Sequence, residues 1–192
     1  MARGGDMSSW HRAQPWVSLV VRLALAGVFL TAGLLKVGDL AASGRAVNAY
    51  QILPYDAAMI FGAAQPFVEI ALGLLLLVGL ATRLAGWISA VMMVAFIAGI
   101  SSAWARGLNI DCGCFSKGGV LPPGVTPNYV PELLRDAAFL AMAVFLIIYP
   151  LSRFSLDARL DQLSTTDEAF EEYDDDNGED EPAAPAARQR RP

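Results

Sequence analysis

A pair of cysteines separated by one glycine is the part of this chain best suited to chemistry. Both of its 2 cysteines lie in the stretch Asp111-Cys112-Gly113-Cys114-Phe115, inside a long polar break between apolar segments. A thiol pair exchanges electrons with other thiols and disulfides without any further cofactor. The spacing therefore predicts thiol–disulfide redox chemistry, with Cys112 and Cys114 as the reacting residues.

Two other interpretations of the pair stay open. A bridge across a single residue closes a very small ring, and strained bridges are easier to reduce. Gly113 permits the unusual backbone conformation that such a ring needs. The same two cysteines could instead form a static bridge that ties the loop, or remain free thiols.

A metal site is a further alternative. A structural zinc site is usually tetrahedral with Cys or His ligands. Besides its cysteines the chain has 1 histidine, His11, which is expected on the other side of the membrane, and Asp111 could add one oxygen. We therefore expect no metal. Lys117 would favour a thiolate at Cys114 and Asp111 would oppose it, so these two residues and Gly113 are expected to support the loop.

The segments that must position the thiols are apolar. The chain is 55% hydrophobic and 17% charged, and segments of nearly the ~20 residues needed to cross a bilayer as a helix occur at 17–35, 60–80, 84–104 and 133–149. The last segment is the weakest because Arg135 and Asp136 lie near its start, although Pro131 suits the first turn of a helix. We predict an all-α membrane protein built as a bundle of four transmembrane helices.

This bundle is expected to occupy residues 16–151, between two polar tails at 1–15 and 152–192. The second tail is acidic and then Ala/Pro-rich, so it cannot bury enough apolar surface to fold and is expected to be mostly disordered. A short amphipathic helix is predicted within 38–55, ended by Pro54. The loop at 105–128 is rich in Gly and Pro, which favours turns, and could fold back as a lid over the helix ends.

The orientation follows from two arguments. An even number of spans puts both termini on one side of the membrane. The basic residues near the spans weakly favour the cytoplasm as that side. A close thiol pair outside the cytoplasm would be expected to oxidise or to exchange disulfides. We therefore expect a multi-pass protein of the plasma membrane with cytoplasmic termini and an extracytoplasmic cysteine loop. No basic patch forms a face, so no nucleic-acid partner is expected.

Glu69 is the most isolated charge in the chain, midway along the second predicted span. An ionisable group at that depth is costly unless it is paired, hydrated or neutralised, and it is a functional candidate by default. Lys36 and Arg135, at the ends of other spans, are its candidate partners, and Gln65 could add a hydrogen bond. These groups would form a proton or ligand site in the bundle interior, or a structural ion pair without chemistry.

Several stretches resemble DoxX-like membrane proteins and their MauE branch, the methylamine-utilisation protein E family. They are residues 28–36, ending in Leu34-Leu35-Lys36; residues 46–54, ending in Tyr50-Gln51-Ile52-Leu53-Pro54; residues 66–79, beginning Pro66-Phe67-Val68-Glu69; and the Asp111-Cys112-Gly113-Cys114-Phe115 loop. The resemblance covers about residues 17 to 150. It implies a membrane bundle linked to disulfide formation in, or maturation of, a periplasmic enzyme, methylamine dehydrogenase.

Together these patterns predict a thiol–disulfide oxidoreductase or a subunit of one. Cys112 and Cys114 would pass electrons between an extracytoplasmic thioredoxin-like or other thiol protein and a membrane acceptor, a quinone by analogy alone. The alternative is a non-catalytic membrane subunit that anchors or assembles a partner complex, with the cysteines as a static staple. A small transporter centred on Glu69 is weaker because the chain shows no internal repeat.

Overall fold

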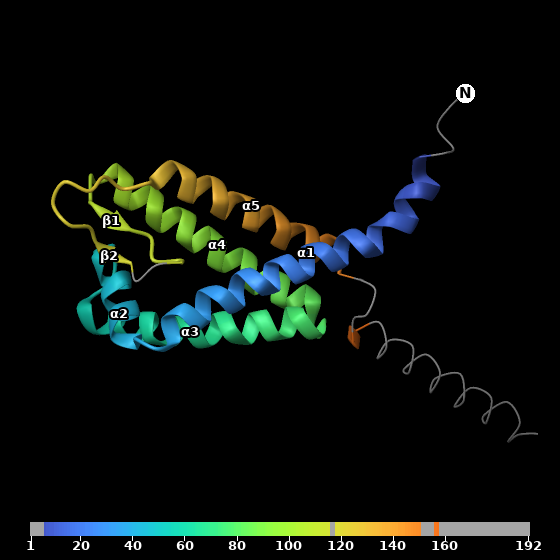
Figure 1. The fold of residues 1–192 in the computed structure, drawn as a ribbon, viewed down its shortest axis with the longest axis horizontal. Coiled ribbons are helices and arrows are strands. Elements are labelled where there is room, and N and C mark those ends of the chain that lie inside the picture. Colours follow the sequence, from blue (N-terminus) through green and yellow to red (C-terminus); the bar gives the residue numbers. More distant parts are fainter. Residues whose placement is uncertain (1–5, 116–117, 151–155, 158–192) are drawn as a thin grey trace, which may run out of the picture.

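The computed structural model describes residues 6–115, 118–150 and 156–157, with side chains from Ala13 onward. The described residues form five helices and one short hairpin, which follow one another as shown in Figure 1. In chain order these elements are α1 (Asp6–Val37), α2 (Leu40–Ala49), α3 (Tyr55–Val78), α4 (Thr82–Ala105), β1 (Ile110–Asp111), β2 (Gly119–Val120) and α5 (Tyr129–Ile148).

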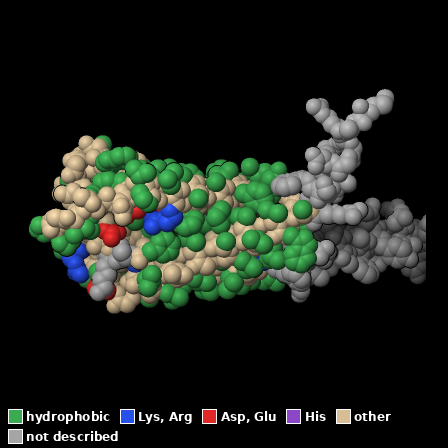
Figure 2. All heavy atoms as spheres, turned by 45° about the horizontal axis from the view of Figure 1, so that its top comes forward, with side chains coloured by type: hydrophobic (Ala, Val, Ile, Leu, Met, Phe, Trp, Pro, Cys, Tyr) green, Lys and Arg blue, Asp and Glu red, His purple; other side chains and the backbone are tan. Residues whose placement is uncertain are grey.

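Three of the helices are long and apolar enough to cross a membrane: Ala13–Val37 within α1, then α3 and α4. This confirms the prediction of an all-α membrane protein. Helix α5 has 20 residues, but Glu132, Arg135 and Asp136 lie in its first turns, so it does not join that group and its crossing stays a prediction. In Figure 2, hydrophobic side chains cover most of the length of the bundle, whereas acidic and basic side chains gather at the end that carries the hairpin.

The bundle is built from pairs of helices. α1 packs along α3, α4 packs along α5, and α2 lies against α3. Large apolar side chains from these helices meet in a common core that includes Leu25, Phe29, Leu72, Leu76 and Leu146. The hairpin lies at one end of this bundle, and the turn between α3 and α4 lies at the other (Figure 1).

Glycines let α1 pack closely against α3 and let α4 pack closely against α5. The described glycines do not bring α3 close to α4. A Cβ on Gly33 of α1 would lie 2.8 Å from the Pro66 carbonyl oxygen of α3, and Gly73 of α3 faces Leu30 of α1. Gly86 of α4 faces α5 near Ile147 instead. Although the turn between α3 and α4 is short, α3 therefore makes its close contacts with α1 and α2, while α4 makes its own with α5.

Helix α1 runs through the predicted domain boundary at residue 16, because it begins at Asp6 with Pro15 inside it. A proline removes one backbone donor but holds φ near the helical value, so a helix can continue through it at the loss of one hydrogen bond. Residues 1–5 and most of the tail predicted at 152–192 lie outside the described residues.

Asp157, in the predicted polar tail, is attached to the turn between α3 and α4. Its carboxylate accepts hydrogen bonds from the backbone N–H groups of Ala81 at 2.7 Å and Thr82 at 2.8 Å. These donors belong to the N-terminus of α4, where backbone N–H groups have no partner within the helix. Ala81 itself is in the left-handed conformation, with a φ of 49°.

Helix α2 is the short helix predicted within residues 38–55, but it ends at Ala49, before Pro54. Asp39 begins it by accepting a hydrogen bond from the Ala42 N–H at 2.9 Å. Gln51 then takes a positive φ of 52°, which turns the chain, and Pro54 immediately precedes α3. The buried face of α2 is made of small residues, Ser43, Gly44, Ala46 and Ala49.

The loop that carries the cysteines contains a short antiparallel pair of strands, which the sequence did not predict. Ile110 pairs with Val120 and Asp111 pairs with Gly119. β1 and β2 therefore form a hairpin, and both cysteines follow β1 directly. Lys117, expected to support the thiols, lies outside the described residues.

Candidate functional site

The hairpin places both thiols against the helical bundle. Cys112 is partly buried, Cys114 is only 7% exposed, and no bridge joins them. The Tyr50 hydroxyl, just after α2, donates a hydrogen bond to the Cys112 carbonyl at 3.1 Å. The Gly113 N–H donates to Asp111 Oδ1 at 3.0 Å. The backbone between the thiols is thus fixed from α2 and from within the hairpin.

Gly113 fits the unusual backbone that the sequence suggested for it. Its φ is 74°, in the left-handed region that favours glycine. A Cβ at this position would lie 3.1 Å from the Gly118 Cα and 3.5 Å from the Ala46 Cβ. The hairpin therefore needs glycine between the cysteines both for its conformation and for its close approach to α2.

Arg135 of α5 connects the thiols to the bundle. Its Nη2 atom lies 3.3 Å from Cys112 Sγ and 3.0 Å from Asp136 Oδ1. Its guanidinium carbon also lies 5.1 Å from the centre of the Phe115 ring, which favours a cation–π contact. The sequence suggested Arg135 as a partner for Glu69; the structure pairs it with Asp136 and Cys112 instead, because the start of α5 faces the hairpin.

The two thiols differ in their protonation. The pKa of Cys112 is lowered to about 6, chiefly by a hydrogen bond from the Cys114 thiol and, despite its partial burial, also by the Cys114 backbone N–H and by Arg135. The pKa of Cys114 is raised, first by that same hydrogen bond and then by burial and by the charges of Cys112 and Asp136. These contacts therefore favour Cys112, and not the more buried Cys114, as the thiolate of the pair.

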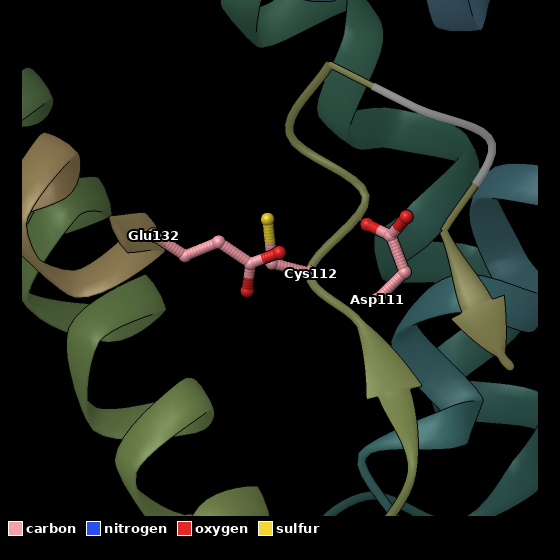
Figure 3. A group of neighbouring side chains, drawn as sticks. All are labelled: Asp111, Cys112 and Glu132. Carbon is pink, nitrogen blue, oxygen red and sulfur yellow. The ribbon is translucent and has the colours of Figure 1, made fainter. Parts of the chain in front are cut away.

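A cluster of oxygen and sulfur donors surrounds Cys112. One ligand atom from each of Asp111, Cys112 and Glu132 lies within 4.8 Å of the others, and Figure 3 shows the Glu132 carboxylate reaching from α5 toward the sulfur. A metal ion here would compete with the Arg135 guanidinium, which lies 3.3 Å from the same sulfur. We therefore assign no metal to this cluster.

Glu69 pairs with Lys36 inside the bundle. Lys36 Nζ lies 2.7 Å from Glu69 Oε1, with side chains 6% and 2% exposed. Gln65, one turn earlier on α3, donates to the same oxygen at 2.9 Å. The structure thus joins two of the three intramembrane candidates, Lys36 and Glu69, and places the third, Arg135, on the thiols.

Two small cavities lie beside the thiols. Cys112, Lys36 and Tyr50 line one of about 60 Å³. Cys114, Asp136 and Glu69 line the other, of about 20 Å³. Each is smaller than the ~150 Å³ cavity that holds a benzene ring. Neither has room for the ring of a quinone, the acceptor that the sequence suggested by analogy.

Three residues of the site were missed by the sequence reasoning. Asp136 and Glu132 lie in the charged first turns of α5. The sequence signal that could have found them was a pair of carboxylates close to Arg135 in an otherwise apolar helix. Tyr50 looked like one apolar position of an amphipathic helix, and nothing in the sequence placed its hydroxyl on the Cys112 carbonyl.

Comparison with known proteins identifies the family. The family model described as Methylamine utilisation protein MauE matches residues 14–149. No curated protein and no solved structure matches the chain. The matched range includes all three membrane-length helices, the hairpin with both cysteines, and α5. The chain is therefore a multi-pass membrane protein whose surroundings are a lipid bilayer, and it belongs to the family of methylamine utilisation protein MauE.

Proposed function

We propose that this chain acts in thiol–disulfide exchange through Cys112 and Cys114. The observation that carries the proposal is the position of the Cys112 sulfur, 3.3 Å from the Arg135 guanidinium and next to a buried thiol. A thiolate is the nucleophile in disulfide exchange, and a neighbouring arginine favours it. The second thiol supplies the group that completes the exchange.

The exchange proceeds in two steps. Cys112 attacks one sulfur of a disulfide on a partner protein, forming a mixed disulfide and releasing the partner's other sulfur as a thiolate. Cys114 then loses its proton and attacks Cys112, which releases the partner's second sulfur. The partner disulfide is reduced to two thiols while Cys112 and Cys114 are oxidised to one disulfide. The reverse sequence delivers a disulfide to a partner dithiol.

The proposed partner is an extracytoplasmic thioredoxin-like or other thiol protein, with the hairpin outside the plasma membrane and the termini in the cytoplasm. The end-to-end separation of the hairpin from the α3–α4 turn supports this topology (Figure 1). It requires α5 to be the fourth crossing. The resemblance to DoxX-like proteins and the family's link to methylamine utilisation favour a role in the maturation of an extracytoplasmic enzyme.

The rival function is a membrane subunit that anchors a partner complex and uses the cysteines as a static staple. The hairpin is already held by other contacts. Tyr50 donates to the Cys112 carbonyl at 3.1 Å, and the hydroxyl of Tyr129 on α5 donates to the carbonyl of Leu108. A bridge is therefore not needed to fix the loop, which favours the redox proposal.

Thiol trapping in intact membranes tests the proposal. The redox state of each cysteine is measured by alkylation after brief exposure to a disulfide oxidant or a thiol reductant. Exchange predicts that the pair cycles between dithiol and disulfide, and that Cys114→Ser accumulates a mixed disulfide at Cys112. A pair that never changes state, with Cys112→Ser behaving like the parent, would overturn it. A membrane-impermeant alkylating reagent added from outside tests the predicted side.

A further inference from the structure

In the proposed exchange, Cys114 must lose its proton before it attacks Cys112. Cys114 is 7% exposed, so its proton cannot pass freely to bulk water when it attacks Cys112. It needs an acceptor inside the protein. This inference rests on the proposed function and concerns how the second thiol is activated.

Asp136 is a buried carboxylate beside Cys114. It is 1% exposed and lines the cavity of about 20 Å³ that Cys114 also lines. Its Oδ1 atom lies 3.0 Å from Arg135, whereas its Oδ2 atom has no hydrogen-bond partner in the part of the chain that the structure describes. A buried polar atom without a partner costs stability and calls for an explanation, such as a role in chemistry.

We propose that Asp136 accepts the proton of Cys114 when the pair closes to a disulfide and returns it when the pair is reduced. In the closing step the Cys114 S–H bond breaks, its proton goes to Asp136 Oδ2, and the Cys114 sulfur forms the S–S bond to Cys112. The electron pair of the broken mixed disulfide leaves with the sulfur of the partner protein. In the opening step each transfer is reversed.

The negative charge of Cys112 couples this proton transfer to the first step. Before reaction, the hydrogen bond to Cys112 and the negative charge of Cys112 both raise the pKa of Cys114 and hold its proton. When Cys112 enters a mixed disulfide, that charge is gone. Arg135 remains beside both sites and opposes the effect of Asp136 on Cys114. The second thiol is thus released for deprotonation only after the first has reacted.

Glu69 is the competing acceptor because it lines the same cavity. Its Oε1 atom accepts from Lys36 at 2.7 Å and from Gln65 at 2.9 Å, while its Oε2 atom, like Asp136 Oδ2, has no hydrogen-bond partner among the described residues. Asp136, and not Glu69, is the carboxylate whose charge acts on Cys114. Glu132, which lies on α5 like Asp136, is grouped with Cys112 and Asp111 and does not line this cavity.

The reaction of the full chain in detergent micelles with dithiobis(nitrobenzoate) tests the proposal. This disulfide releases one coloured thiolate when Cys112 attacks it and a second when Cys114 resolves the adduct, so the two steps appear as separate phases. We expect Asp136→Asn to leave the first phase within about twofold and to slow the second by about 100-fold, the usual size of an acid–base contribution. Asp56→Asn, which removes an exposed carboxylate from the first turn of α3, should leave the second phase within about twofold.

Each outcome has a distinct meaning. A second phase that is unchanged in Asp136→Asn, or one that Glu69→Gln slows instead, overturns the role of Asp136. A parent protein without any second phase overturns the proposed function itself. If Asp136→Asn does not fold, as the loss of its helical circular dichroism would show, Asp136→Glu decides. Its second phase must show a shifted pH midpoint relative to the parent, and an unchanged midpoint overturns the proposal.

Discussion

The guanidinium of Arg135 donates a hydrogen bond to the sulfur of Cys112 over 3.3 Å. Replacing Arg135 with methionine removes this donor and its charge while keeping most of the apolar stem. We expect the alkylation of Cys112 at pH 6 to slow by about fivefold, because raising its pKa by about one unit from about 6 lowers the thiolate fraction at that pH from about one half to about one tenth. Arg135→Lys keeps the charge and should slow it less. Equal rates in the parent and the methionine variant would show that Arg135 does not stabilise the thiolate.

The Cys112 thiolate predicts a characteristic pH profile. Its pKa is lowered to about 6, first by the hydrogen bond from Cys114, so its alkylation rate should rise as the pH rises through about 6 and then level off. Cys114→Ala removes the donor and should move the midpoint upward, whereas Cys114→Ser keeps a hydroxyl donor and should move it less. A midpoint that is the same in all three proteins would contradict the hydrogen bond as the main cause.

The buried pair of Lys36 and Glu69 predicts non-additive stability effects. Glu69→Gln leaves the lysine charge buried without its partner, and breaking a buried pair in this way costs about 3 kcal/mol or more of unfolding free energy. The double variant Lys36→Met/Glu69→Gln should be more stable than Glu69→Gln alone. Thermal unfolding in detergent measures both. A double variant that loses the sum of the two single losses would argue against a direct interaction.

Gly113→Ala tests the backbone of the hairpin. The new Cβ would meet the Gly118 Cα at 3.1 Å while φ stays at 74°, so the hairpin must move or strain. A left-handed conformation costs a non-glycine residue about 1–2 kcal/mol. We expect a lower melting temperature and a slower alkylation of Cys112 at pH 6, because its donors shift. Gly107→Ala is the matched control, since its φ is 67° and a Cβ there meets nothing within 4 Å. It should lose stability without changing Cys112.

The carboxylate of Asp157 predicts a stabilising role for the segment after α5. Asp157→Ala removes the acceptor for the N–H groups of Ala81 and Thr82, and the loss of a helix N-terminal cap costs about 1 kcal/mol. The variant should unfold at a lower temperature in a scan. Ala81→Gly is the complementary change, and it should raise the temperature because glycine adopts a φ of 49° without steric cost. No change in either variant would mean that this turn does not contribute to stability.

The sequence predicted the apolar helices well because the length of an apolar run directly reports a membrane span. It also offered Lys36 and Arg135 as candidate partners of Glu69, since charges deep in apolar helices have few partners to choose from, and the structure pairs Glu69 with Lys36. It could not predict that Arg135 contacts Cys112 and Asp136. That contact depends on the rotation of α5 about its axis and on a hairpin too short to leave a periodic pattern. Nor could it predict that Pro15 would lie inside α1.

The charged start of α5 has a consequence for how the chain is inserted during synthesis. Arginine and aspartate each cost about 2.5–3.5 kcal/mol at the centre of an inserting helix, and less near its ends, so α5 is the least able of the long helices to enter a bilayer alone. Its close partner is α4, which is long and apolar enough to cross a membrane and directly precedes the hairpin. We therefore expect α4 and α5 to leave the translocation machinery together. A protein whose α4 is replaced by an unrelated apolar helix should leave α5 outside the membrane.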